Sequence, residues 1–268
     1  MQWRKWILGE WNWKRPFKSL AFIYVVLAIT ACGFSNKFIF QPQASQYTPN
    51  AFRLEMLTGS EGEQIAAFWY PPAKPDGPVL LWSHGNAEDI GALVPLHREL
   101  ATEGFGILAY DYPGFGLSEG SPNEAGCYAA IQAAHTHLLT EKKIAPSRIF
   151  IVGQSVGSGP ACWLAEREDT AGLILVSPFL SAFRTVTTIP LFPGDKFPNI
   201  HRIKKIDEPL LVIHGTVDNT IPFSHGRKLH DLHPGPKKFL PIDGTDHNSI
   251  WPIGYDEITA ALLEFTTP

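Results

Sequence analysis

The chain has 268 residues and a formal net charge of −4. Hydrophobic residues make up 44% of it and charged residues 18%, a balance that excludes a disordered chain and argues against a broad basic surface for nucleic acid. This length fits one α/β domain with a short appendage.

The N-terminal segment differs in composition from the rest of the chain. Tryptophan and basic residues crowd residues 1–19, and an uncharged apolar run occupies residues 20–34. The run is shorter than the ~20 residues of a membrane-spanning helix, but it is long enough for the hydrophobic part of a signal peptide. Because basic residues precede the run, we expect the N-terminus in the cytoplasm and the main domain on the exported, periplasmic or extracytoplasmic side of a membrane.

The end of this run contains a cysteine. Residues 27–33 read LAITACG, which resembles a bacterial lipoprotein processing site with Cys32 as the lipidated residue. An uncleaved signal anchor and a hydrophobic helix packed on the domain are the alternatives. We therefore assign residues 1–40 to a membrane anchor or lipoprotein signal, 41–50 to an extended linker and 51–268 to a single α/β domain.

From residue 54 onward, strand and helix patterns alternate along the chain. Two strands around a glycine-containing turn predict an antiparallel hairpin at 54–57 and 65–70. Short apolar runs typical of buried parallel strands follow at 79–83, 106–110, 148–153, 172–177, 209–214 and 237–241. Helical patterns occupy 93–103, 124–140, 156–166, 223–232 and 255–265. The alternation predicts a mostly parallel central sheet with helices on both faces, and the Pro-containing segment between 177 and 209 predicts a minimal lid over an open site.

One serine lies in a sharp turn between a strand and a helix. The apolar residues 149–152 lead into Gly153-Gln154-Ser155-Val156-Gly157, and a helical pattern follows. Glycines on both sides of such a turn avoid clashes and leave the serine hydroxyl above the sheet, at a helix N-terminus that favours negative charge. We therefore predict Ser155 as a nucleophile, held in a turn that requires Gly153 and Gly157.

A serine hydroxyl needs a base, and histidine is the side chain that serves near neutral pH. His247 lies on the loop after the last predicted strand, and Asp218 lies on the loop after the strand before it. The carboxyl ends of parallel strands meet at one edge of a sheet, so we expect Ser155, Asp218 and His247 to converge there as nucleophile, acid and base. Asp246 adjoins the histidine and is badly aimed, and Asp111 precedes the serine, so we interpret Asp111 as a turn-capping carboxylate.

An oxyanion formed at the serine would need two backbone N–H donors. Val156, the residue after the serine, is the first predicted donor. Asn86, in the loop after the strand at 79–83, is the second, because Gly85 lets the backbone turn inward. His84 in the same loop is interpreted as structural, since a base is already placed.

Nothing in the sequence predicts a metal site or a cofactor. The three cysteines, Cys32, Cys127 and Cys162, form no Cys-x-x-Cys pair, and no Cys/His cluster has zinc-ligand spacing. We expect Cys127 and Cys162 to be buried thiols that pack as small hydrophobic side chains.

Five stretches together resemble the α/β-hydrolase superfamily over residues about 50–265. They read SHGNA at 83–87, DYPGFGLSEG at 111–120, GQSVG at 153–157, HGTVDNTIP at 214–222 and GTDHN at 244–248. More narrowly, the chain is similar to a small membrane-anchored branch near serine aminopeptidase-like hydrolases and eukaryotic protein depalmitoylases. The resemblance implies an α/β-hydrolase fold and hydrolysis of an ester, thioester or amide through an acyl-enzyme. Depalmitoylation is not carried over, because those enzymes have a cysteine-rich N-terminus and this chain has one cysteine there.

The sequence thus predicts a serine hydrolase of the carboxylesterase or thioesterase type, acting on a small-molecule or acyl substrate. A serine aminopeptidase-like peptidase is one alternative, although no carboxylate that would hold a free amine stands out near the lid. A non-catalytic binding protein on the same fold is the other. Substrate identity and oligomeric state are not determined by the sequence, because one fold hosts many functions.

Overall fold

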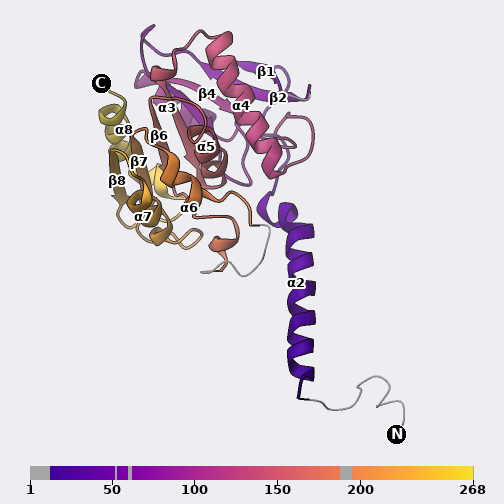
Figure 1. Cartoon of the computed structure of the whole chain (residues 1–268). Coiled ribbons are helices and arrows are strands. Elements are labelled where there is room, and N and C mark those ends of the chain that lie inside the picture. Colours follow the sequence, from indigo (N-terminus) through magenta and orange to yellow (C-terminus); the bar gives the residue numbers. More distant parts are fainter. Residues whose placement is uncertain (1–12, 52, 60–61, 188–194, 268) are drawn as a thin grey trace.

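The computed structural model describes residues 13–51, 53–59, 62–187 and 195–267; within these ranges the side chains of Ala31, Cys32 and Phe34 are not described. An eight-stranded sheet lies at its centre (Figure 1). The strands are β1 Leu54–Thr58, β2 Gln64–Tyr70, β3 Val79–Ser83, β4 Gly106–Tyr110, β5 Ile149–Gln154, β6 Gly172–Val176, β7 Leu210–Gly215 and β8 Lys237–Ile242. Their order is β1-β2-β4-β3-β5-β6-β7-β8, with β1 and β2 antiparallel and the others parallel. The predicted α/β-hydrolase fold, a mostly parallel sheet with an antiparallel N-terminal hairpin, is confirmed.

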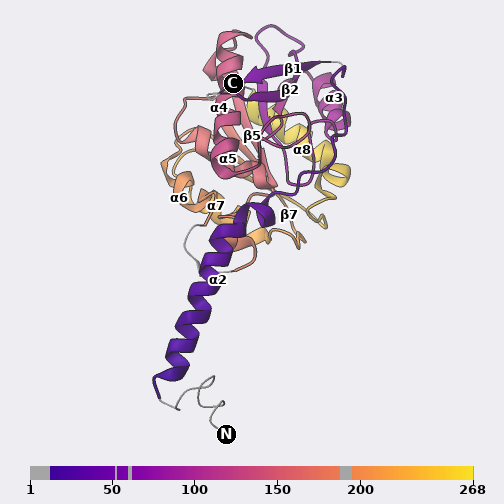
Figure 2. The same cartoon turned by 90° about the vertical axis from the view of Figure 1, so that its right-hand side faces the viewer.

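Helices cover both faces of the sheet (Figures 1 and 2). Helices α4, α5 and α7 contribute to the core on one face, and α3 and α8 to the core on the other. The bounds are α2 Arg15–Ile39, α3 Val94–Thr102, α4 Glu124–Thr140, α5 Ser158–Ala165, α6 Asn199–Arg202, α7 Phe223–Leu232 and α8 Ile250–Thr266, with 3₁₀ turns η1 Pro146–Arg148, η2 Ser155–Gly157, η3 Phe183–Thr185 and η4 Ile203–Lys205.

The apolar runs of the sequence form strands that are buried on both sides. In β3, Val79 and Leu81 join the core beneath α4 and α5, whereas Leu80 and Trp82 join the core beneath α3 and α8. All four are fully buried, and a buried aliphatic or aromatic side chain contributes about 1.5–3 kcal/mol to folding. A continuous apolar strand is therefore stable only between two helical layers.

Two helix boundaries differ from the expectation. The helix expected at 255–265 begins earlier, at Ile250. Pro252 does not prevent this, because it lies in the first turn, where its missing N–H costs no hydrogen bond. The helix expected at 156–166 is divided into the 3₁₀ turn at Ser155–Gly157 and α5. The segment between β6 and β7 holds only η3, α6 and η4 among its described residues.

Helix α2 extends away from the domain (Figures 1 and 2). It contains Cys32, whose side chain lies outside the described residues, so its predicted lipidation stays a prediction. Among its described residues, ten large hydrophobic side chains are exposed: Phe17, Leu20, Phe22, Ile23, Tyr24, Val25, Val26, Leu27, Ile29 and Phe38. In the described part of the chain, α2 included, no helix combines the length and hydropathy that crossing a membrane requires.

The chain returns to the domain at the end of α2. Phe40 is 4% exposed, and its ring packs edge-on against Phe115 and Phe197. Beyond it, the chain runs along the loop that follows β3.

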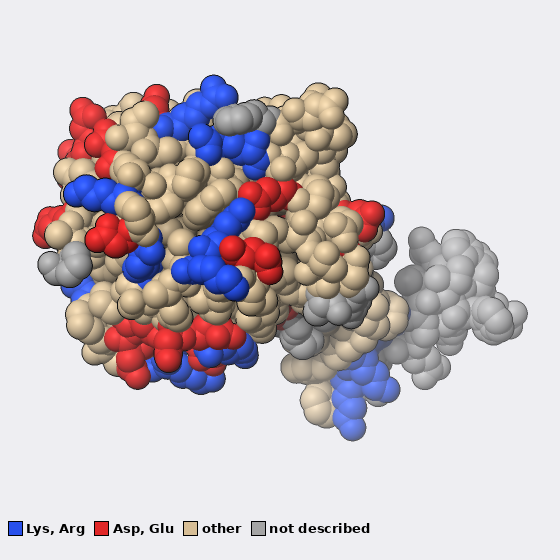
Figure 3. Space-filling model, turned by 90° about the horizontal axis from the view of Figure 1, so that it is seen from above, with Lys and Arg blue, Asp and Glu red and all other residues tan. Residues whose placement is uncertain are grey.

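On the face of the domain shown in Figure 3, acidic and basic side chains are interspersed among uncharged ones.

Candidate active site

Three loops after parallel strands meet at one edge of the sheet. Ser155 directly follows β5, Asp218 follows β7 and His247 follows β8. These strands are neighbours or near neighbours in the order β5-β6-β7-β8, so their carboxyl ends lie side by side. The structure therefore brings together the three side chains that the sequence predicts as nucleophile, acid and base.

The turn at Ser155 has strained backbone geometry. Ser155 has a φ of +52°, a left-handed conformation that is unfavourable for residues with a Cβ. A Cβ on Gly153 would lie 2.6 Å from the Cβ of Ala161, and a Cβ on Gly157 would lie 2.2 Å from the Ser83 carbonyl oxygen. Neither position accepts a side chain, which is the physical reason for a glycine at each.

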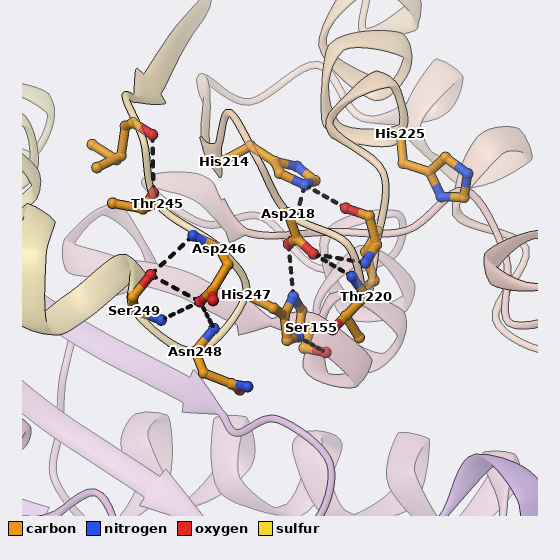
Figure 4. Close-up of polar contacts among 12 residues, drawn as sticks. Ser155, His214, Asp218, Thr220, His225, Thr245, Asp246, His247, Asn248 and Ser249 are labelled. Carbon is orange, nitrogen blue, oxygen red and sulfur yellow. Dashed lines mark hydrogen bonds and ion pairs between the residues drawn. The ribbon is translucent and has the colours of Figure 1, made fainter.

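A continuous line of hydrogen bonds joins the three residues (Figure 4). His247 Nε2 lies 2.9 Å from Ser155 Oγ, and His247 Nδ1 lies 2.7 Å from Asp218 Oδ2. The tautomer that satisfies both contacts carries its proton on Nδ1, donates it to the carboxylate and accepts the serine O–H at Nε2. This arrangement prepares the imidazole to take up the serine proton.

The environment of Asp218 stabilises its ionised form. Its Oδ1 accepts the backbone N–H groups of Thr220 at 2.9 Å and Ile221 at 2.8 Å. Burial by itself would raise the pKa of Asp218, but hydrogen bonds from His214, His247 and the Ile221 N–H outweigh it and hold the pKa well below its usual range. A permanent negative charge is thus fixed beside the imidazole.

His214 is a member of this network that the sequence reasoning missed. Its Nε2 lies 2.9 Å from the Ile221 carbonyl oxygen and 3.4 Å from Asp218 Oδ2, so the Nε2–H faces both (Figure 4). The ring is fully buried at the end of β7. The sequence feature that could have identified His214 is its position four residues before Asp218.

The rejected candidates have other partners. Asp246 accepts hydrogen bonds from the backbone of Asn248 and Ser249, within its own loop (Figure 4). Asp111 is fully buried and accepts from Tyr47 Oη–H and from the Ile90 N–H at 2.9 Å. His84 is also fully buried, and desolvation lowers its pKa to about 4.

The predicted oxyanion donors border the same cavity as the serine. Asn86 and Val156 both line it, while the Asn86 Oδ1 accepts the Gln41 N–H at 2.9 Å. The N–H of Gly85, in the same loop, is already donated to Glu88 Oε1 at 2.6 Å. That Asn86 and Val156 donate to an oxyanion stays a prediction.

The cavity above Ser155 has a volume of about 1020 Å³, large enough for a small organic ligand or an acyl chain. The end of α2 forms one wall, and the segment after β6 forms another. The larger apolar side chains of the lining are Phe38, Ile39, Leu93, Leu96, Val156, Phe179, Phe183, Val186, Ile221 and Trp251. Phe179 is both buried in the core and part of this lining.

No group of three or more potential metal ligands occurs within residues 13–51, 53–59, 62–187 and 195–267. Cys127 and Cys162 are buried free thiols, as predicted. The residues that meet at the site are a serine, a histidine and an aspartate joined by hydrogen bonds.

Comparison with protein families gives a match to "Serine aminopeptidase, S33" over residues 73–193. Human alpha/beta hydrolase domain-containing protein 17B is 38% identical over 211 residues, which cover 78% of this chain and 73% of the relative. The mouse 17C protein is 40% identical over 175 residues, 64% of this chain and 55% of the relative. Among solved structures, the Pyrococcus furiosus esterase Pf2001 superposes with a TM-score of 0.69 at 18% identity, covering 84% of this chain and 97% of the esterase.

Proposed function

Because this chain belongs to the alpha/beta hydrolase domain-containing protein 17 family of α/β hydrolases, we propose that it is a serine hydrolase that cleaves carboxylic ester or thioester bonds through an acyl-enzyme. The observation that carries the proposal is the hydrogen-bonded line from Ser155 to His247 to Asp218, at 2.9 and 2.7 Å. Ser155 and His247 line a cavity that is large enough for an acyl group.

The proposed reaction uses each member of this line. His247 Nε2 takes the hydroxyl proton as Ser155 Oγ attacks the carbonyl carbon, and Asp218 stabilises the imidazolium that forms. The N–H groups of Asn86 and Val156 hold the oxyanion. The imidazolium then gives its proton to the departing alcohol or thiol, and water, activated by the same histidine, releases the acid.

The lining of the cavity favours an acyl group with an apolar body. Phenylalanine, leucine and isoleucine side chains from α2, α3 and the segment after β6 line the same cavity as the serine. Burial of a chain against them contributes about 0.8 kcal/mol per methylene group. We therefore expect turnover to increase with acyl length until the cavity is filled.

The test is hydrolysis of p-nitrophenyl esters from acetate to palmitate by the full chain, because Phe40 is part of the core and a protein beginning after it would lose this contact. We expect measurable turnover that falls by at least about 10⁴-fold in Ser155→Ala. Undiminished activity in this variant would reject the nucleophile. A folded wild-type protein without activity on any ester would favour the peptidase or the non-catalytic binding protein.

We also propose that the N-terminus attaches the protein to a membrane, with the catalytic domain on the exported side. The exposed apolar side chains of α2 and the preceding basic residues support this proposal. Lipidation at Cys32 and an uncleaved anchor are the two forms of attachment that the sequence suggests.

A further inference from the structure

Glu88 stands out among the residues that line the cavity above Ser155. It lies on the loop after β3 and is the one carboxylate among the described lining residues, which include no lysine or arginine. His247 is the other titratable side chain in this lining. Glu88 is thus a single, half-buried acidic group in an otherwise neutral and mostly apolar lining, where an unpaired charge is unfavourable.

The structure places this carboxylate beside the nucleophile. A Cβ built on Gly85 would lie 2.5 Å from Glu88 Oε1 and 3.7 Å from Ser155 Cβ, so both side chains border the same backbone position. Oε1 accepts the Gly85 N–H at 2.6 Å, and Gln154 Nε2 lies 3.5 Å away. Within the described ranges, no basic side chain forms an ion pair with Glu88.

The surroundings compensate the charge only in part. Desolvation raises the pKa of Glu88 to about 7, although the Gly85 hydrogen bond and the nearby His247 oppose the rise. An ionised carboxylate here would also repel the oxyanion that forms next to it during catalysis. A positive charge on the substrate removes both penalties, since it pairs with the carboxylate and shields the oxyanion.

We propose that Glu88 is a specificity-determining residue that binds a positively charged ammonium group carried by the substrate a few bonds from the scissile carbonyl. This inference rests on the proposed acyl hydrolysis at Ser155 and names the class of acyl group that the site prefers: an apolar body with one cationic nitrogen. Acyl groups that carry a carboxylate at the same place are disfavoured.

The test compares p-nitrophenyl esters that differ only in charge. The first acyl group is trimethylammoniobutyrate, and the second is its carbon isostere, with a tert-butyl group in place of the trimethylammonium. Glutarate supplies a negatively charged third. At pH 8, above the pKa of about 7, we expect the wild-type kcat/KM to be at least about tenfold higher for the cationic ester than for its isostere, and lowest for glutarate.

Glu88→Gln removes the charge but keeps a side-chain carbonyl that can accept the Gly85 N–H. We expect the ratio between the cationic ester and its isostere to fall towards one in this variant, and to be partly restored in Glu88→Asp. Glu99→Gln, on the exposed side of α3, makes the same change in net charge outside the cavity and should keep the wild-type ratio. A wild-type ratio near one, or an unchanged ratio in Glu88→Gln, would overturn the proposal.

Binding separates this inference from the proposed function. In the Ser155→Ala background, the affinities for the cationic ester and its isostere are measured by calorimetry with and without Glu88→Gln. A preference for the cation that requires Glu88 supports the inference even if the wild-type protein hydrolyses none of the esters. Equal affinities would reject the inference even if neutral esters are turned over through Ser155.

Discussion

At the scale of single residues, Asp218 has more contacts than a carboxylate needs to orient one histidine. Its Oδ1 accepts two backbone N–H groups, and its Oδ2 faces both His247 and His214. The backbone contacts fix the carboxylate whether or not the histidine is present. The position of the imidazole is therefore set by a group that is itself held rigidly.

We expect Asp218→Asn to lower kcat by roughly 10³–10⁴-fold with a smaller change in KM. The amide lacks the negative charge that stabilises the imidazolium, and its NH₂ group favours the wrong tautomer of His247. Steady-state kinetics on the best p-nitrophenyl ester measure the change. Thermal unfolding of the variant provides the control, and a loss below tenfold would show that Asp218 does not orient the base.

At the scale of elements, α2 and the chain after it are tied to the loop that carries Asn86. The Gln41 N–H donates to Asn86 Oδ1 at 2.9 Å, and the Gln46 N–H donates to Asp89 Oδ2 at 2.7 Å. Tyr47 Oη–H donates to the buried Asp111. The C-terminal end of α2 thus forms part of the cavity wall, while the rest of the helix, which extends away from the domain, exposes an apolar surface.

Vesicle binding tests the role of this apolar surface. Ile29 on α2 and Ile253 on α8 are 67% and 66% exposed, so an aspartate at either position costs the domain little packing. If α2 inserts into a lipid surface, Ile29→Asp should weaken co-sedimentation with phosphatidylglycerol-containing vesicles at least about tenfold, since insertion of one isoleucine contributes about 1.5–3 kcal/mol. Ile253→Asp should bind as the wild type does. Equal binding by both variants would exclude insertion at Ile29.

At the scale of the whole molecule, neutral histidines in the core make stability depend on pH. His97 is fully buried with its ring against Trp82, and neither ring nitrogen has a hydrogen-bond partner in the part of the chain that the structure describes. Desolvation lowers its pKa to about 3. The unfolded chain therefore binds more protons below pH ~6.5, and the stability present above that pH is lost as the pH falls towards 3.

We expect His97→Leu to reduce the loss of unfolding free energy between pH 7 and pH 5 by about 2 kcal/mol. Glu88 and Asp111, whose pKa values burial raises to about 7, act in the opposite direction, but their contributions cancel when variant and wild type are compared. Urea unfolding at the two pH values gives the difference. His201→Leu, at an exposed position, is the matched control, and an equal change in both variants would contradict the assignment.

The sheet and the turn at Ser155 follow from the sequence alone. Apolar runs bounded by glycine and proline specify buried strands. A side chain at residue 153 would clash with Ala161, which is close in the chain, and one at residue 157 would clash with Ser83, at the end of a neighbouring strand. The chain order of Ser155, Asp218 and His247 followed from the same strand pattern. These features depend on local propensity and on the rule that parallel strands end at one edge.

Which other side chains reach that edge depends on how distant parts of the chain pack together. Glu88 reads in the sequence as an ordinary loop glutamate, and its place in the cavity depends on Gly85 and Gln154, the latter 66 residues away. The contact of Gln41 with Asn86, across 45 residues, likewise makes the end of α2 part of the site. Such contacts arise from the packing of distant loops, whose relative positions neither hydrophobic period nor turn chemistry encodes.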